Sequence, residues 1–316
     1  MRNAESFIVS TINSVLKEKR IAIEVIVVND KSTDRSLEKL LSVSDERIRI
    51  VDGPGAGISA CLNAGFAAGT GDIVMRCDAD DHYPEHRIHD QVAWLDANPA
   101  YAAVCGSFST MDSSGHLVAK MPTGNQKEDI TQELNSGKTR THFCTFAIRR
   151  EAFHQVAGFR QYFETSEDID LQLRLGEAIN VMYLPESMYF YRIHNNSITH
   201  TQGNSRRLFY EDTARLFQVQ RKASGKDDLQ RGDPPKPPVA DYDAPGNITQ
   251  QLQGILIGTA WHEHVEGNRL KAIGLGFRAL RHSPLNITLW KSFLALIVKP
   301  RKKTCKAKRN KCETYN

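Results

Sequence analysis

The first 110 residues alternate between two patterns of hydrophobic positions. Residues 5–17 carry apolar side chains at a spacing near 3.6, which predicts an amphipathic helix with one face on a core. Residues 23–28 (IEVIVV) form a short β-branched run, as in buried parallel strands. The alternation continues with helices over 34–41 and 58–67 and with strands over 47–51, 72–77 and 102–106. Strands and helices alternating at this spacing predict an α/β fold whose sheet has parallel order.

Beyond about residue 110 the pattern is less regular. It predicts strands over 145–149 and 182–184 and a helix over 169–177. Residues 222–246 are rich in Ser, Gly, Asp and Pro, which predicts a linker or loop. Residues 250–281 and 285–298 predict helices, and their aromatic side chains at helical spacing favour packing on the preceding domain.

Composition and charge narrow the class of protein. The 316 residues are 40% hydrophobic and 25% charged, as in soluble globular proteins, which excludes a disordered or collagen-like chain. The apolar run at 293–298 is far shorter than the roughly 20 residues that cross a bilayer. The net charge is +4, but residues 299–316 hold eight basic residues and one acidic residue, so this tail is +7 and residues 1–298 sum to −3.

Cysteine usage indicates the compartment. The six cysteines form no C-x-x-C pair, and four of them lie in apolar stretches, as expected for free thiols in a reducing environment. The first 25 residues contain no apolar signal core, so the three N-x-S/T triplets are interpreted as chance. We therefore expect a cytoplasmic protein.

Two acidic clusters follow predicted strands, at the sheet edge where open α/β folds bind ligands. Asp30 follows the strand at 23–28, and Asp78-Ala-Asp80-Asp81 follows the strand at 72–77. Carboxylates this close repel one another unless a cation or hydrogen-bond donors lie among them. A D-x-D sequence at a strand end suits Mg²⁺ or Mn²⁺. The alternative is a solvated acidic turn, which this cluster alone does not exclude.

A third acidic cluster, Glu164-Thr-Ser-Glu167-Asp168-Ile-Asp170, precedes the predicted helix at 169–177. Acidic residues in a first helical turn are favoured by the helix dipole, so helix capping explains the cluster on its own. The functional alternative is a general base that deprotonates a hydroxyl group.

Taken together, these segments resemble the family 2 glycosyltransferases. The resemblance runs from about residue 3 to residue 199, and it rests on the order of five motifs: IVVNDKSTD, GxGISxxLNAG, GDIVMRCDADD with PEHRI, EDIDLQLRL and YRIHNNSI. Each motif is weak alone, but their order and spacing are specific.

The resemblance implies an inverting, nucleotide-sugar-dependent transferase with a Rossmann-like A-type glycosyltransferase fold and a C-terminal helical extension. By the family pattern, Asp30 would meet the uracil edge of a UDP-sugar. The loop around Gly57 would approach the nucleotide, and Asp78 would lie near the ribose.

The remaining family positions concern the metal and the acceptor. Asp80 would hold the Mn²⁺ or Mg²⁺ that bridges the diphosphate, and His194 matches a histidine close to that metal; a surface-loop histidine is the alternative. Asp168 matches the catalytic base, and Glu167 would shape the acceptor site. The implied acceptor is a glycan or a lipid-linked glycan in cell-surface polysaccharide synthesis.

One part of the family pattern is missing. The family opens with an apolar strand of the form VSVIIPxxN, of which only the end is found at residues 1–3. That strand would lie centrally in the sheet, so we expect its neighbours to have unpaired backbone groups and nucleotide affinity to suffer. A truncated or mis-started reading frame would explain the difference. Asn29 also replaces the first of two usual aspartates.

Two other functions remain open. A degenerate glycosyltransferase-like protein would bind a nucleotide or a partner without turnover; the missing strand favours it, whereas Asp30, Asp80 and Asp168 oppose it. A nucleotidyltransferase would also use an acidic metal site, but it would normally show a basic, glycine-rich phosphate loop near the first strand.

The resemblance and the composition together predict the domain organisation. We expect a catalytic domain over 1–221, with a nucleotide-binding half at about 1–110 and an acceptor half at about 111–221. A linker or loop at 222–246, helices at 247–298 and a basic tail at 299–316 follow. An apolar helix beside a basic cluster also suits peripheral contact with the inner face of the membrane, the alternative to a solvated tail. Nucleic-acid binding is disfavoured, because the body is acidic.

Overall fold

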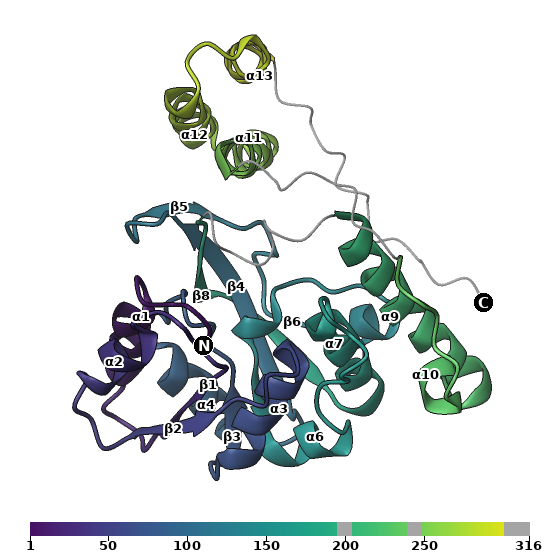
Figure 1. The fold of residues 1–316 in the computed structure, drawn as a ribbon. Helices are drawn as coiled ribbons and strands as arrows, with labels where there is room; N and C mark the ends of the chain where they lie inside the picture. Colours follow the sequence, from purple (N-terminus) through teal and green to yellow (C-terminus); the bar gives the residue numbers. More distant parts are fainter. Residues whose placement is uncertain (195–203, 239–247, 300–316) are drawn as a thin grey trace, which may run out of the picture. The chain divides into compact units, whose positions relative to one another are not determined.

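The helices and strands expected in the first 110 residues all form in the computed structural model (Figure 1). The structure describes residues 1–194, 204–238 and 248–299, and it divides into two compact units between Ile248 and Thr249. The helices of the first unit are α1 (Ile8–Leu16), α2 (Ser36–Leu41), α3 (Ile58–Ala68), α4 (Arg87–Ala97), α5 (Thr131–Asn135), the 3₁₀ turn η1 (Phe143–Thr145), α6 (Arg150–Gln155), α7 (Glu167–Ala178), α9 (Asn204–Ser224) and α10 (Asp228–Arg231).

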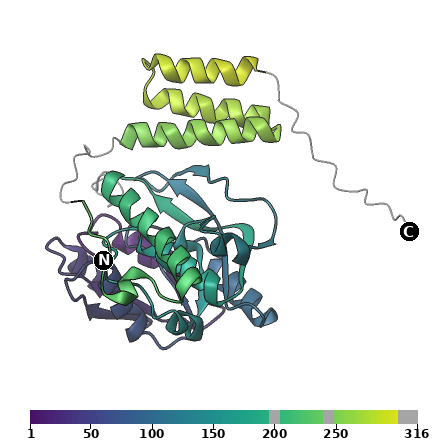
Figure 2. The same cartoon turned by 90° about the vertical axis from the view of Figure 1, so that its right-hand side faces the viewer.

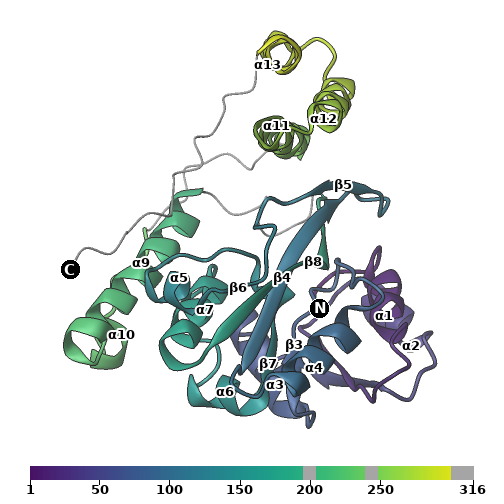
Figure 3. The same ribbon diagram turned by 180° about the vertical axis from the view of Figure 1, so that it is seen from behind.

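The strands of the first unit lie in two sheets. β1 (Val25–Asn29) and β2 (Ile48–Asp52) form a parallel pair in which Val25 lies opposite Ile48. The second sheet has the order β3-β7-β4-β8-β6, with β5 paired to β4; these strands are β3 (Ile73–Met75), β4 (Ala103–Met111), β5 (Leu117–Lys120), β6 (Glu128–Asp129), β7 (Ala147–Arg149) and β8 (Val181–Arg192). The long strands β4 and β8 run side by side at its centre (Figure 3).

The parallel order expected for the strands of the first 110 residues is found in the β1–β2 pair, and the second sheet is mixed. β4 and β8 are parallel, but β7 runs antiparallel to both of its neighbours, β3 and β4. Parallel neighbours need a crossover connection, which the alternation of strands and helices supplies only up to β4. The chain reaches β7 after an excursion through β5, β6 and α5, and it enters the sheet in the opposite direction.

Residue 1 occupies part of the edge of β1. The Met1 amino group donates to the carbonyl of Val28, and the Asp30 N–H donates to the carbonyl of Met1 at 2.9 Å. Among the described strands, β1 is hydrogen-bonded only to β2, and β3 only to β7. The sheet of the nucleotide-binding half is therefore in two parts here.

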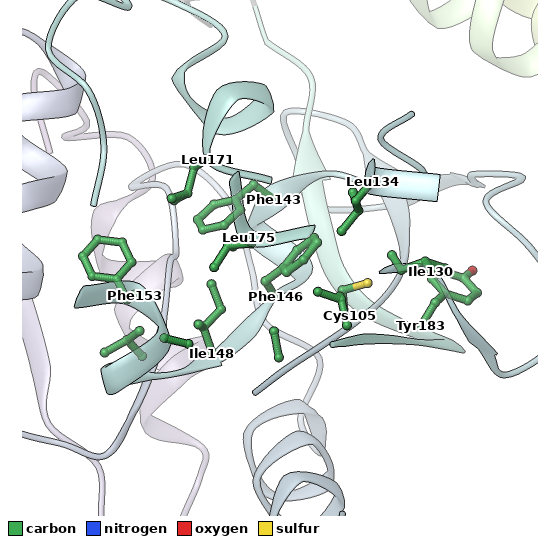
Figure 4. Packing of buried hydrophobic residues seen from close by; sticks show 14 of the residues in the cluster. Cys105, Ile130, Leu134, Phe143, Phe146, Ile148, Phe153, Leu171, Leu175 and Tyr183 are labelled. Atoms are coloured by element: carbon green, nitrogen blue, oxygen red, sulfur yellow. The ribbon is translucent and has the colours of Figure 1, made fainter. Parts of the chain in front are cut away.

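The main core lies between the second sheet and the helices that follow β4. Leu171 and Leu175, one helical turn apart on α7, lie beside Phe143 and Phe146 in a buried cluster that extends to the sheet residue Tyr183 next to Ile130 (Figure 4). Because these side chains are buried, α7 is held against the sheet. The cysteines at 61, 77, 105 and 144 are free thiols, and those at 105 and 144 are buried, in line with the expected use of cysteine.

A long helix that the sequence pattern did not predict covers α7. In α9, Tyr210, Ala214 and Phe217 are buried at helical spacing against Phe163 and Leu173. The segment expected to be a linker at 222–246 begins inside this helix and then forms α10. Its proline-rich part is anchored too, because the Tyr162 hydroxyl donates to the carbonyl of Pro235 at 2.6 Å. Residues 239–246 of the predicted linker lie outside the described residues.

The second unit consists of α11 (Ile248–Glu266), α12 (Arg269–His282) and α13 (Ile287–Val298), whose axes run nearly parallel (Figure 2). A single helix over 250–281 was expected, but Gly267, with φ of 93°, ends α11. Gly276 lets α12 and α13 approach closely, since a Cβ there would lie 2.9 Å from the Phe293 ring. Within the part of the chain that the structure describes, every helix is too short or too polar to cross a bilayer.

Candidate active site

The carboxylate at the end of β1 is buried and fixed by the backbone. Asp30 is 8% exposed, and its Oδ1 accepts a hydrogen bond from the Gly55 N–H at 2.8 Å. A side chain at Gly53 would meet the Asp30 Cα at 2.6 Å, so a glycine is needed there. Gly57 follows with φ of 91° and begins α3, and the position of its missing Cβ faces open space. Asp30 and Gly57 thus lie at one edge of the β1–β2 sheet.

The acidic cluster after β3 is joined to α7 by a buried arginine. Arg76 donates from Nε to the Asp78 Oδ1 at 2.7 Å and from Nη2 to the Asp78 Oδ2 at 3.2 Å. Its remaining nitrogen, Nη1, donates to the Glu167 Oε1 at 3.0 Å. A bidentate arginine–carboxylate pair has fixed geometry as well as charge. Two predicted site residues that are 89 positions apart, Asp78 and Glu167, therefore share one cation.

The electrostatics of this triad differ between its two carboxylates. Burial disfavours ionisation of Asp78, but Arg76 and His142 outweigh burial and hold the pKa of Asp78 below its ordinary value. Burial dominates at Glu167 and raises its pKa to about 7, with Asp168 adding to the effect and Arg76 opposing it. Asp78 is therefore ionised near neutral pH, whereas Glu167 keeps its proton to a higher pH than an ordinary glutamate does.

Asp80 and His194, the two residues that the resemblance relates to the metal, lie together. The Asp80 Oδ2 and the His194 Nε2 are 2.7 Å apart, and the His194 ring is 4.6 Å from the ring of Phe7. A carboxylate oxygen suits Mn²⁺ or Mg²⁺, whereas an imidazole nitrogen is a more usual ligand of transition metals such as Mn²⁺ than of Mg²⁺. Among the described residues, no group of three or more His, Cys, Asp or Glu side chains could hold a metal alone. A cation at this pair would therefore need further ligands from substrate oxygens.

Arg192, the last residue of β8, holds the acidic loop after β3 (residues 78–81) through two hydrogen bonds. Its Nε donates to the Asp80 carbonyl at 2.6 Å, and its N–H donates to the Asp81 Oδ1 at 2.7 Å. Asp81 is 1% exposed, and burial beside Asp80 and Asp78 raises its pKa well above the ordinary value. Asp81 thus supports the backbone of the site, whereas Asp80 keeps a partly exposed side chain.

The predicted base lies at the beginning of α7. Ser166, which precedes the helix, has φ of 58°, and this left-handed residue turns the chain into α7. Glu167 is buried, whereas Asp168 is half-exposed and accepts a hydrogen bond from the Ile169 N–H at 2.9 Å. A half-exposed carboxylate such as that of Asp168 could receive a proton from a bound hydroxyl group.

Sequence reasoning missed three residues of this site, namely Arg76, His142 and Arg192. His142 packs among aromatic rings, with its ring 6.0 Å from that of Tyr189. Burial lowers the pKa of His142 although Asp168 and Asp78 favour its charged form, so this ring lies within electrostatic reach of both carboxylates. Of these three residues, only Arg76 could have been found from the sequence. It is a charged residue inside the apolar run IVMRC, and charged residues are unusual in a buried strand. Residues 195–198 of the predicted YRIHNNSI motif lie outside the described residues.

The fold is that of an A-type glycosyltransferase. A solved structure with this fold is that of S. aureus TarS, residues 1–349, in complex with UDP-GlcNAc. The alignment has a TM-score of 0.59 and 14% identity, and it covers 94% of this chain and 77% of that chain. At this identity the likeness shows the fold.

The family follows from the sequence comparison. Residues 1–157, about half of the chain, match the model of glycosyl transferase family 2, and this match supports a family 2 glycosyltransferase. It is 26% identical over 197 residues to the chondroitin synthase of Pasteurella multocida, covering 62% of this chain. It is 29% identical over 209 residues to the uncharacterised glycosyltransferase EpsJ of Bacillus subtilis, covering 63% of this chain. The matches span 20% of the chondroitin synthase and 61% of EpsJ.

The raised pKa of Glu167 gives a pH prediction. Between the unfolded pKa of 4.5 and the folded pKa of about 7, the folded chain keeps the Glu167 proton while the unfolded chain loses it. The stabilising contribution is therefore complete below pH 4.5 and is lost as pH rises through about 7. We expect the wild-type free energy of unfolding to fall from pH 5 to pH 8 relative to that of Glu167→Gln. Urea unfolding at the two pH values measures this difference. The exposed control Glu186→Gln should leave the wild-type pH dependence unchanged.

Proposed function

We propose that this protein transfers a sugar, with inversion, from a UDP-sugar to a glycan or lipid-linked acceptor in cell-surface polysaccharide synthesis. One observation carries the proposal: Arg76 ties Asp78, on the donor side of the family pattern, to Glu167, beside the expected base. A protein that only bound a nucleotide would not need the link from Arg76 to Glu167 at the expected base. The relatives support the setting, since they include enzymes named chondroitin synthase and hyaluronan synthase.

In this proposal the donor lies along the ends of β1 and β3. Asp30 would accept hydrogen bonds from the uracil ring, and Asp78 would meet the ribose. The open space at Gly57 would admit the nucleotide beside the amino terminus of α3, whose free N–H groups favour a phosphate. The TarS complexes with UDP-GlcNAc and UDP support a uridine nucleotide.

Asp80 and His194 would hold Mn²⁺ or Mg²⁺ together with diphosphate oxygens. Bound there, the cation would supply charge stabilisation for the β-phosphate oxygen of the departing UDP. Arg192 fixes the Asp80 backbone, so the carboxylate would stay in place when a cation binds.

The acceptor reaction would use Asp168. Its carboxylate would take the proton of the acceptor hydroxyl, and that oxygen would attack the anomeric carbon from the face opposite the diphosphate. The bond from the anomeric carbon to the β-phosphate oxygen would break, so the electron pair leaves with UDP and the configuration inverts. Glu167, held by Arg76, would shape the acceptor site.

The donor half of the proposal can be tested by binding. We expect the full chain to bind UDP in titration calorimetry more tightly with Mn²⁺ than without it. Asp80→Ala should lose most of this metal-dependent gain, because one direct ligand is removed. Asp96→Ala, which changes an exposed aspartate on α4, is the control and should bind like the wild type. Equal UDP affinity with and without Mn²⁺ in a folded chain would contradict the metal assignment.

A further inference from the structure

Helix α13 presents apolar side chains to solvent along one face. Ile287, Trp290, Leu294 and Val298 recur at spacings of three and four residues, and they are between 43% and 76% exposed. On α12, Phe277 is 54% exposed, and its ring is 6.4 Å from that of Phe293, which in turn is 6.1 Å from that of Trp290. These five exposed residues form a continuous surface, the α12–α13 apolar face.

Packing among the helices of the second unit does not explain why these apolar side chains lie on the surface. The opposite side of α13 is already buried through Leu289 and Leu296, and Phe293 and Leu296 pack closely over Gly276 of α12. A surface helix of a soluble protein normally has one apolar side, so a second one points to a further apolar contact. The Trp290 Nε1 donates to the Pro284 carbonyl at 2.7 Å, so its ring can leave water without an unpaired N–H.

The charge around this face is of one sign. From residue 267 to residue 299 the sequence contains no Asp or Glu, but it contains Arg269, Lys271, Arg278, Arg281, Lys291 and Lys299. A second copy of the chain would bring the same cations and be repelled. An anionic lipid surface complements both features, because apolar side chains can enter the acyl boundary while cations meet the headgroups.

We propose that the α12–α13 apolar face is a docking surface for anionic membrane. It differs from a simple electrostatic tail, since insertion of Trp290 and Leu294 would be required as well as charge. Docking itself does not depend on the transferase activity. Its use, to bring the site to a lipid-linked acceptor, rests on the proposed function.

The test is flotation of the full chain with phosphatidylcholine vesicles that contain or lack phosphatidylglycerol. We expect binding only to the phosphatidylglycerol vesicles, and a loss of about tenfold or more in partitioning for Leu294→Asp, because a charge replaces an inserted leucine. The control Val219→Asp changes a valine of similar exposure on α9 and should bind vesicles like the wild type.

Three outcomes would overturn the proposal. A folded chain could fail to float with either vesicle, or Leu294→Asp and the wild type could float equally, which would assign binding to the basic tail. The chain could also dimerise in solution and become monomeric in Leu294→Asp without any vesicle binding, which would make the face a self-association surface. UDP calorimetry without vesicles tests the proposed function separately, and Leu294→Asp should bind UDP normally.

Discussion

Replacing Asp168 with asparagine is expected to lower kcat by roughly 10²- to 10⁴-fold, the usual contribution of a general base. Asparagine has nearly the shape of aspartate, but its side chain cannot take the proton from the hydroxyl group of the acceptor. Asp168 is half-exposed and accepts a hydrogen bond from the neighbouring Ile169 N–H, which an asparagine oxygen can also accept, so the fold should be unaffected. UDP release from a UDP-sugar measures the rate, and calorimetry should show unchanged UDP affinity.

A matched substitution separates this effect from a general loss of negative charge. Asp96 is an exposed aspartate on α4, and Asp96→Asn should retain the wild-type rate. A rate for Asp168→Asn within about twofold of the wild type would be far below the contribution of a general base and would remove Asp168 from the mechanism.

The second large effect concerns the ion cluster that holds α7. Asp170 is fully buried and accepts hydrogen bonds from Arg160 and from the Arg174 Nε at 2.9 Å, while Arg160 also reaches Asp227 before α10 at 2.6 Å. Removing one partner of a buried ion pair leaves uncompensated charge in the interior. We expect Asp170→Ala to lower the free energy of unfolding by about 3–5 kcal/mol. Urea denaturation measures this loss.

An exposed ion pair of the same region provides the control. Glu164 pairs with Arg206, but its side chain is 55% exposed, so Glu164→Ala should cost no more than about 1 kcal/mol. If Asp170→Ala cost as little as Glu164→Ala, the buried cluster would not be what fixes α7.

Much of the site could be predicted because strand ends are visible in the sequence. β-Branched runs mark β1 and β3, and the acidic residues directly after them, Asp30 and Asp80, had to lie at one edge of the strands. The pairing of Asp80 with His194 could not be derived from spacing, since the two residues are 114 positions apart. The resemblance implied a place near the metal for each of them, and their side chains lie 2.7 Å apart. The roles assigned to these residues remain predictions.

Other features depend on tertiary contacts that no local pattern encodes. The direction of β7 follows from the route of the chain through β5 and β6, which are too short to stand out as strands. The bridging role of Arg76 exists only because α7 packs where it does. Helix α9 was missed because its buried positions, Tyr210, Ala214 and Phe217, lie among many charged residues.

The central claim is that the acidic loop after β3 and the beginning of α7 form one transferase site. Its most direct test is incubation of the full chain and Mn²⁺ with a panel of UDP-sugars and a cell-envelope glycolipid extract. We predict release of UDP and, by NMR, a product whose anomeric configuration is opposite to that of the donor. Metal-dependent UDP binding without any UDP release would contradict the account and indicate a nucleotide-binding protein that has lost turnover.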